Sequence, residues 1–320
     1  MTHFLSRRVL ASICVWGGLF SAFPGVVSAE EIGVLMHANN HGFFRGLERG
    51  MRRAADDLGV LLMVRSLSVR AILDNQDNVQ LPVIDHMLRR KVCGIILAPE
   101  ALKAGAAPVS IPVPLVLVDR DGPQFKAQTT VSTDNFAAGR SSALSLAPVL
   151  PKGANVVVLR LLPDSTSTTQ REEGFISVAR EKGWNVVSDP VVGGQFREAE
   201  ERIANALQGL SGRLDAVFAP NESIAFGAVH VVGAMPLQFR PRLAAVDWRP
   251  EFRQALEDGV LYSTVLQDND AMGRRAVELA LAACRGKDIL PRISIDVAVA
   301  TRANMNDPAI RAMMANYETP

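Results

Sequence analysis

Five apolar, strand-like runs in this sequence of 320 residues are each followed closely by polar side chains. Their carboxylate, amide, imidazole and guanidinium groups can hydrogen-bond a polar ligand, and some could form an acid–base or metal cluster. Single positions also have structural explanations, since Asn221 could cap a helix and Asp119 could end a turn. Five such positions together favour a ligand site. The residues are Asn39 and His41 after residues 32–36, Asp119 and Arg120 after 115–118, Asn221 after 216–219, Asp247 after 243–246 and Gln267 after 264–266.

The surrounding sequence predicts how these positions come together. Strand-like and helix-like segments alternate almost without interruption, which predicts parallel sheets covered by helices on both faces. Ligands of open α/β sheets bind at the carboxyl ends of the strands. The strand count is high for one sheet, so two Rossmann-like lobes and a closed eightfold barrel both stay open. The predicted strands are residues 32–36, 60–64, 92–97, 114–119, 155–162, 184–187, 216–219, 243–247, 263–267 and 293–300, and the predicted helices are 43–58, 82–89, 135–150, 169–182, 197–210, 222–235, 250–258 and 271–284.

The composition is that of a globular protein with about two domains. Hydrophobic residues make up 48% of the chain, which is enough for sizeable cores. The 34 basic and 33 acidic residues give a net charge of +1 without a basic block, which argues against a nucleic-acid partner.

The N-terminus has the pattern of an export signal. Arg7 and Arg8 precede the apolar residues 9–20, and the small residues Ser28 and Ala29 end the segment. The alternative, a membrane anchor, is disfavoured because Pro24 interrupts the run before the ~20 apolar residues that a span needs. We therefore predict that residues 1–29 are a signal peptide, cleaved after Ala29, and that the mature protein is periplasmic.

Two cysteines, Cys93 and Cys284, remain in the predicted mature chain. One lies in an apolar strand and the other near the end of a helix, and these separate settings favour two buried free thiols over a disulfide. Neither belongs to a Cys/His cluster, so no structural zinc site is predicted.

Catalytic motifs are absent from the sequence. It contains no G-x-S-x-G elbow, no P-loop and no G-x-G-x-x-G that opens a helix. Asp119, Asp247, His37 and His41 could be imagined as an acid–base or metal cluster, but no ligand spacing supports that interpretation. We expect a protein that is not an enzyme and needs neither cofactor nor metal.

Stretches along nearly the whole predicted mature chain resemble the type I periplasmic binding proteins of the ribose-binding kind. They include "IGVLMHANNHGFFRGLERG", "CGIILAPE", "PLVLVDR", "VSTDNFAAGR", "REEGF", "AVFAPNESIAFGA", "AAVDW" and "STVLQDNDAMGRR". The resemblance implies an α/β protein of two Rossmann-like lobes with parallel sheets, joined by a three-crossing hinge near residues 133–134, 267 and 295–297. The N-terminal lobe would comprise residues 30–133 plus 268–295, and the C-terminal lobe residues 134–267 plus 296–320.

The resemblance also implies a pocket for a sugar-like ligand. Aromatic rings bury the apolar faces of a sugar ring, while paired donors and acceptors suit its hydroxyls. Of two adjacent phenylalanines, one is expected to be core and one to line the cleft. The ligand-binding residues predicted in this way are His37, Asn39, His41, Phe43, Phe44, Asp119, Arg120, Thr169, Asn221, Asp247, Trp248 and Gln267.

Departures from the family pattern leave the ligand open. The family carries two arginines near residues 169–171, but this chain has Thr169 at the first position and keeps only Arg171. In the family an aromatic residue usually precedes the aspartate that corresponds to Asp247, whereas here Trp248 follows Asp247. A neutral pentose or hexose is the first choice, a polyol the second, and a sugar acid or another small polar signal the third.

Two outputs share this binding fold. The protein is expected to deliver its ligand to an inner-membrane ABC permease, or alternatively to present its closed form to a sensor protein such as a histidine kinase or chemoreceptor. A transcriptional regulator is excluded because an export signal occupies the place of a DNA-binding domain. A monomer is expected. Residues 304–320 are predicted to form a short helix on one lobe, without a function.

Overall fold

The computed structural model describes residues 29–37, 41–67, 79–100, 108–162, 165–194, 196–210 and 212–318. The predicted signal peptide, apart from Ala29, and Asn39 lie outside the described residues, so both predictions stay predictions. None of the helices in the described part of the chain is long and apolar enough to cross a membrane.

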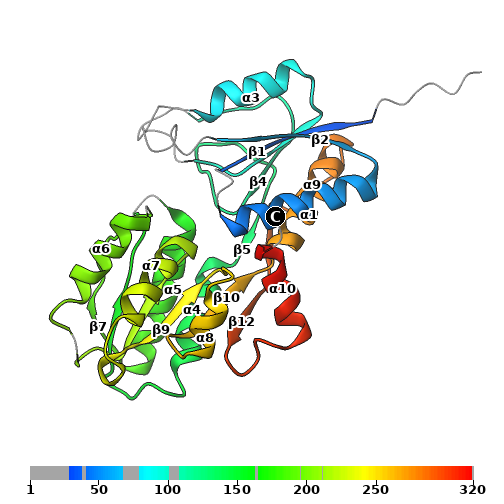
Figure 1. Ribbon diagram of the computed structural model, residues 1–320. Helices are drawn as coiled ribbons and strands as arrows, with labels where there is room; N and C mark the ends of the chain where they lie inside the picture. Colours follow the sequence, from blue (N-terminus) through cyan, green and yellow to red (C-terminus); the bar gives the residue numbers. More distant parts are fainter. Residues whose placement is uncertain are drawn as a thin grey trace, which may run out of the picture.

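The first sheet contains six parallel strands in the order β11-β5-β4-β3-β1-β2. Its strands β1, β2 and β4 are labelled in the upper part of Figure 1. Three of its inner strands are buried along their whole length, as is typical of parallel sheets covered on both faces. Its strands are β1 (Glu31–Met36), β2 (Leu61–Ser66), β3 (Gly94–Leu97), β4 (Leu115–Val118), β5 (Thr129–Thr133) and β11 (Arg292–Ile295).

The second sheet repeats this order as β12-β10-β9-β8-β6-β7. Its pairs are parallel except for β10 and β12, which run antiparallel. Its strands are β6 (Asn155–Val158), β7 (Asn185–Ser188), β8 (Ala216–Ala219), β9 (Arg242–Val246), β10 (Leu261–Gln267) and β12 (Val297–Thr301).

Helices cover both faces of each sheet. In the first lobe α1 and α9 pack together on one face and α3 lies against β1, while in the second lobe α4 packs with α5 and α6 with α7. The helices are α1 (Gly42–Leu58), α3 (Gln80–Arg89), α4 (Asn135–Leu146), α5 (Thr166–Lys182), α6 (Phe196–Leu207), α7 (Glu222–Gly233), α8 (Phe252–Glu257), α9 (Asn269–Cys284) and α10 (Pro308–Glu318), with a 3-10 turn η1 (Leu237–Phe239).

Two separate six-stranded sheets confirm the two-lobed α/β prediction and make the closed barrel wrong. The chain passes from one sheet to the other after β5, returns after β10, and crosses again between β11 and β12. These passages fall where the resemblance put the hinge. We therefore propose lobe boundaries at residues 133/134, 267/268 and 295/296.

The expectation of free thiols is wrong. Cys93 and Cys284 form a disulfide, with their Cα atoms 5.5 Å apart. Cys93 immediately precedes β3, and Cys284 is the last residue of α9, which packs on β3 and β4. The parallel sheet and its covering helix thus bring together two residues that are 191 positions apart in sequence.

Two other elements differ from the sequence prediction. Strand β5 was not predicted, because its sequence Thr-Thr-Val-Ser-Thr is mostly polar, although all five of its residues are buried. The predicted last strand, residues 293–300, is divided into β11 and β12, which belong to different sheets.

Candidate functional site

A buried hydrogen-bond network lies at the carboxyl ends of the second sheet, centred on Arg171 of α5. The Arg171 side chain is only 3% exposed and its Nη1 is 3.8 Å from Asp247 Oδ2. Its Nε donates to Asn135 Oδ1 (2.8 Å), its Nη1 to the carbonyl of Pro220 (3.0 Å), and its Nη2 to Gln267 Oε1 (2.9 Å). The guanidinium therefore ties together residues from four elements or their loops.

Gln267, the last residue of β10, connects this network to the first lobe. Its Oε1 also accepts from Thr133 Oγ1 at 2.7 Å, and Thr133 ends β5 in the other sheet. Its Nε2 donates to Asp247 Oδ1 at 2.6 Å. Both amide ends are therefore engaged, which fixes the orientation of the side chain at a crossing between the lobes.

Asp247 directly follows β9 and is buried. Besides Gln267, the backbone N–H of Glu222 donates to its Oδ2 at 3.1 Å. Burial raises the pKa of the Asp247 carboxyl, while Arg171 and the bond from Gln267 act in the opposite direction. The backbone of Asp247 has φ = 77°, in the left-handed region that a side chain with a Cβ rarely adopts.

Asp119 occupies the same structural position in the first lobe. It directly follows β4, is 5% exposed and has φ = 72°. Arg120 Nε donates to its Oδ2 at 2.9 Å. Each lobe thus ends an inner strand with a strained, buried aspartate, and strain of this kind concentrates at functional sites.

The end of β1 and the start of α1 supply imidazole and aromatic groups of the first lobe. Phe43 and Phe44 are each 5% exposed and meet edge to face, with ring centroids 5.2 Å apart. The ring of His37 lies 5.3 Å from that of Phe44, and its Nδ1 is bonded to Glu100. Both phenylalanine rings are equally buried, so the expected division into a core ring and a cleft ring is not visible in this conformation.

His41 brings the two lobes into contact. It occupies the N-cap position of α1 without a side-chain capping hydrogen bond, and its Nδ1 lies 3.6 Å from Oε1 of Glu222 on α7. Glu222 is 4% exposed and also faces Arg249 Nη1 at 3.4 Å. Its second oxygen, Oε2, is buried without a hydrogen-bond partner among the described residues.

The remaining predicted residues differ in their settings. Asn221 caps α7, because its Oδ1 accepts from the N–H of Ile224 at 3.2 Å. The helix-capping role considered for Asn221 in the sequence is therefore present. Thr169 is partly exposed on α5. Trp248 is fully buried, with its Nε1 donating to Glu318 Oε1 at 2.8 Å, and presents no exposed stacking face in this conformation.

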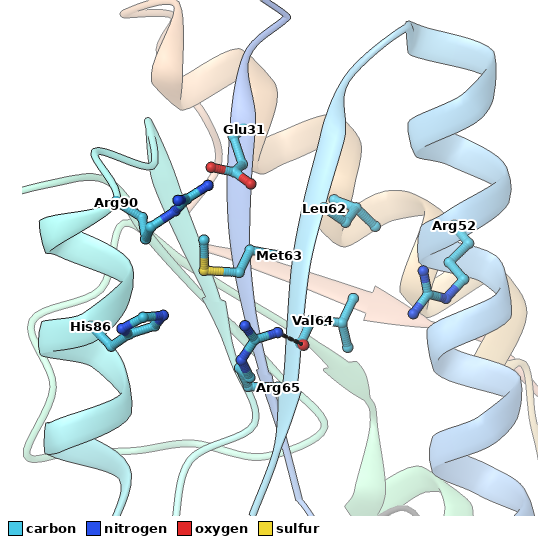
Figure 2. A pocket seen from close by; sticks show the side chains of 8 residues that line it. All are labelled: Glu31, Arg52, Leu62, Met63, Val64, Arg65, His86 and Arg90. Carbon is cyan, nitrogen blue, oxygen red and sulfur yellow. Dashed lines mark hydrogen bonds between the residues drawn. The ribbon is translucent and has the colours of Figure 1, made fainter.

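Two pockets stand out in the described part of the chain. One of about 250 Å³ lies between the lobes, next to the His41–Glu222 contact, and is lined by Gly42, Arg45, Glu222, Trp248, Arg249, Pro250, Glu251 and Tyr317. The other, of about 560 Å³, lies over the edge strand β2, flanked by Arg52 of α1, by His86 of α3 and by Arg90, which directly follows that helix (Figure 2).

The larger pocket contains none of the predicted ligand residues. It is an open groove on one lobe, whereas the buried donors and acceptors converge between the lobes. We therefore assign the candidate site to the interlobe region.

Three residues of this region were not among the predicted ligand residues. Arg171 was noticeable as the arginine of "REEGF", and Glu222 as the neighbour of Asn221. The hydroxyl of Tyr317 lies 3.4 Å from Asp247 Oδ1, but no motif or pattern in the sequence pointed to Tyr317 as a site residue. In the described part of the chain, no three His, Cys, Asp or Glu side chains are grouped so that they could hold a metal ion.

Residues 32–288 match the family model of the periplasmic binding protein domain. The chain belongs to this family. Its members are non-catalytic binding proteins, which confirms both the resemblance and the prediction that the protein is not an enzyme.

Individual relatives extend over most of the chain. The ribose import binding protein of Bacillus subtilis is 26% identical over 275 residues, covering 85% of this chain and 87% of that protein.

Two solved structures have the same fold. A carbohydrate transporter solute-binding protein from Agrobacterium radiobacter, in complex with D-arabinose, has a TM-score of 0.77 at 22% identity and covers 90% of this chain and 99% of its own. An ABC transporter solute-binding protein from Bacillus halodurans with bound myo-inositol has a TM-score of 0.76 at 21% identity, and the match covers 92% of this chain and 100% of that protein's chain.

Proposed function

We propose that this protein is a periplasmic receptor that binds a monosaccharide or a polyol between its two lobes and delivers it to an ABC importer. A neutral pentose or hexose is the first choice of ligand and a polyol the second. The proposed site includes the residues predicted from the sequence, and we add Arg171 and Glu222 to them.

Unused hydrogen-bonding capacity in the Arg171 network carries this proposal. Among the described residues, Arg171 uses three of its five N–H groups and Gln267 one of its two amide hydrogens. The Asp247 carboxylate has about four acceptor sites, of which at most three are occupied. Glu222 Oε2, which has no hydrogen-bond partner within the described ranges, adds another acceptor. Adjacent free donors and acceptors suit hydroxyl groups, because each hydroxyl both donates and accepts.

The names of the relatives support a carbohydrate. The Bacillus subtilis relative is a ribose import protein, and the structural relatives hold D-arabinose and myo-inositol. These ligands share a compact ring carrying several hydroxyls. The altered residues at positions 169 and 248 give a reason not to transfer any one of these ligands to this chain.

Contacts between the lobes support a closure mechanism. His41 and Glu222 come from different lobes, and so do Thr133 and Gln267. A ligand that touches both lobes favours the closed state, because it gains contacts there that the open state cannot offer. The importer would then recognise the closed form.

A thermal-shift screen tests the proposal. Protein lacking residues 1–29 is mixed with D-ribose, D-allose, D-arabinose, myo-inositol, sugar acids and amino acids. A ligand at about a hundred times its Kd adds ~2.7 kcal/mol to the free energy of unfolding, which gives a clear rise in Tm. We expect such a rise with at least one sugar or polyol. A rise in Tm with amino acids alone would contradict the sugar assignment. So would the absence of a rise with every compound tested.

Matched variants locate the binding. Asp247→Ala and Arg120→Ala should abolish the shift, whereas Asp258→Ala, which changes an exposed aspartate of the same lobe as Asp247, should retain it. Loss of the shift in all three variants would mean that the assay reports general destabilisation and not the site.

A further inference from the structure

The C-terminal helix α10 contacts both lobes. It packs on α1 of the first lobe and on β10 and β12 of the second, and it is seen in red beside α1 in Figure 1. Its side chains Ile310, Met314 and Tyr317 belong to one apolar cluster that contains residues of both sheets. The helix lies beyond residues 32–288, which match the family model.

Its contact with the first lobe includes close approaches of the backbone. A Cβ atom at Gly42 would lie 2.9 Å from the carbonyl oxygen of Tyr317, and one at Gly46 would overlap the carbonyl oxygen of Asn316. Arg49 of α1 donates to the same Asn316 carbonyl. Glycines on α1 therefore allow close approach, and a cation near the C-terminal end of α10 is electrostatically favourable.

Its contact with the second lobe reaches the candidate site. The hydroxyl of Tyr317, a residue only 1% exposed, accepts from the backbone N–H of Gln267 at 3.0 Å. Its single hydrogen can be donated to the Gln267 carbonyl at 3.1 Å or to Asp247 Oδ1 at 3.4 Å. The next residue, Glu318, accepts from Trp248 Nε1. The end of α10 thus contacts Asp247, its neighbour Trp248 and Gln267.

We propose that Tyr317 is a positioning residue of the ligand site, and that α10 holds it there by resting on α1. The inference rests on the proposed function, in which Asp247 and Gln267 contact the ligand. The Tyr317 hydroxyl fixes the backbone of Gln267 at the crossing between the lobes and one carboxylate oxygen of Asp247. Both groups are thereby held in place before the ligand arrives.

Tyr317→Phe removes only the hydroxyl and keeps the buried ring. The Gln267 N–H then loses its acceptor, and Asp247 loses a nearby donor, so both become less well ordered. The matched control is Tyr262→Phe, which removes a hydroxyl at the other end of the same strand, β10. A second control, Ile310→Val, removes one methylene group from a buried side chain of α10 without touching the network, and so controls for a general loss of stability.

Binding of D-ribose, D-allose, D-arabinose and myo-inositol to protein expressed from the full chain is measured by calorimetry. For the probes that bind, Tyr317→Phe should raise Kd about tenfold, the loss expected when a buried hydrogen bond is left unmade. Tyr262→Phe and Ile310→Val should stay within twofold, although Ile310→Val lowers Tm. A Kd within twofold of wild type for Tyr317→Phe would overturn the proposal, and so would an equal loss with Ile310→Val.

Amide hydrogen exchange separates this inference from the proposed function. Without ligand, the segment containing Gln267 should exchange faster in Tyr317→Phe than in wild type and in Tyr262→Phe. If none of the four probes binds wild type, the sugar assignment fails, while exchange at Gln267 still decides the role of Tyr317. Unchanged exchange at that segment would overturn it.

Discussion

We predict that Glu172 makes the stability of the second lobe depend on pH. It follows Arg171 on α5 and is 2% exposed. Its Oε1 accepts from the N–H of Leu161 at 3.2 Å, and its Oε2 accepts from Arg160 Nη1 at 3.2 Å. Burial raises the pKa of Glu172 from 4.5 to about 7, although the bonds from Leu161 and Arg160 act in the opposite direction. The residue thus fastens the segment after β6 but is poorly solvated when charged.

The sign of the effect follows from proton binding. Between pH 4.5 and about 7 the unfolded chain has released the Glu172 proton while the folded chain retains it. The folded state therefore binds more protons, and the free energy of unfolding falls as pH rises through this range. A shift from 4.5 to about 7 corresponds to at most about 3 kcal/mol at 1.36 kcal/mol per pH unit, and the effect is constant at higher pH.

The assay is urea unfolding at pH 5 and pH 8. Glu172→Gln cannot titrate but keeps an oxygen that can accept from Leu161, so we expect the variant to lose less stability between these pH values than wild type, by up to about 3 kcal/mol. Glu173→Gln, which changes the exposed neighbour, should follow wild type. If the pH dependence of Glu172→Gln is the same as that of wild type, the buried carboxyl does not titrate in this range and the reasoning is refuted.

Three further predictions concern the disulfide and the site. Replacing Cys93 and Cys284 by Ser should lower Tm, because a cross-link over 191 residues restricts the unfolded chain; disulfides typically contribute about 2–4 kcal/mol, and added reductant should then have no further effect on the variant's thermal unfolding. Arg171→Met should lower the free energy of unfolding by about 3–5 kcal/mol in urea titrations and abolish sugar binding, because it leaves Asp247 buried without its cation. Asp119→Gly should abolish sugar binding in calorimetry yet raise the free energy of unfolding by about 1 kcal/mol, since glycine relieves the strain at φ = 72°; an unfolding free energy below that of wild type would contradict this.

The alternation of apolar runs and helical segments was sufficient to predict parallel sheets covered by helices, because strands buried on both faces have a continuous apolar sequence. The choice of two lobes over a closed barrel came from the resemblance to the binding-protein family. Strand β5 could not be predicted from an apolar run, because its sequence is mostly polar. Its threonines and serine are buried, with Thr133 bonded to Gln267 at a crossing between the lobes. The Cys93–Cys284 disulfide could not be predicted either, because the proximity of β3 and α9 depends on the tertiary fold and not on sequence spacing.

Part of the polar cluster at the candidate site could be predicted, because polar residues at strand ends converge in parallel sheets, while the binding role of these residues stays a prediction. Asp247 and Gln267 do meet, 2.6 Å apart. The residues that support them could not be predicted in the same way. Tyr317 lies 50 positions after Gln267, on a helix beyond the last strand, and only the packing of that helix between the lobes brings its hydroxyl to the site.

Backbone strain distinguishes the two central aspartates from the polar residues around them. Only three described non-glycine residues have positive φ, and two of them are Asp119 and Asp247, the residues that directly follow β4 and β9. Glycine adopts this conformation without a steric cost, and asparagine and aspartate tolerate it better than other residues with a Cβ, though still at a cost. An aspartate kept in a strained, buried position must be held there by its surroundings, and those surroundings are Arg120 in one lobe and Arg171, Gln267 and the Glu222 N–H in the other. The strain therefore supports a binding role for both carboxylates, independently of any resemblance in sequence.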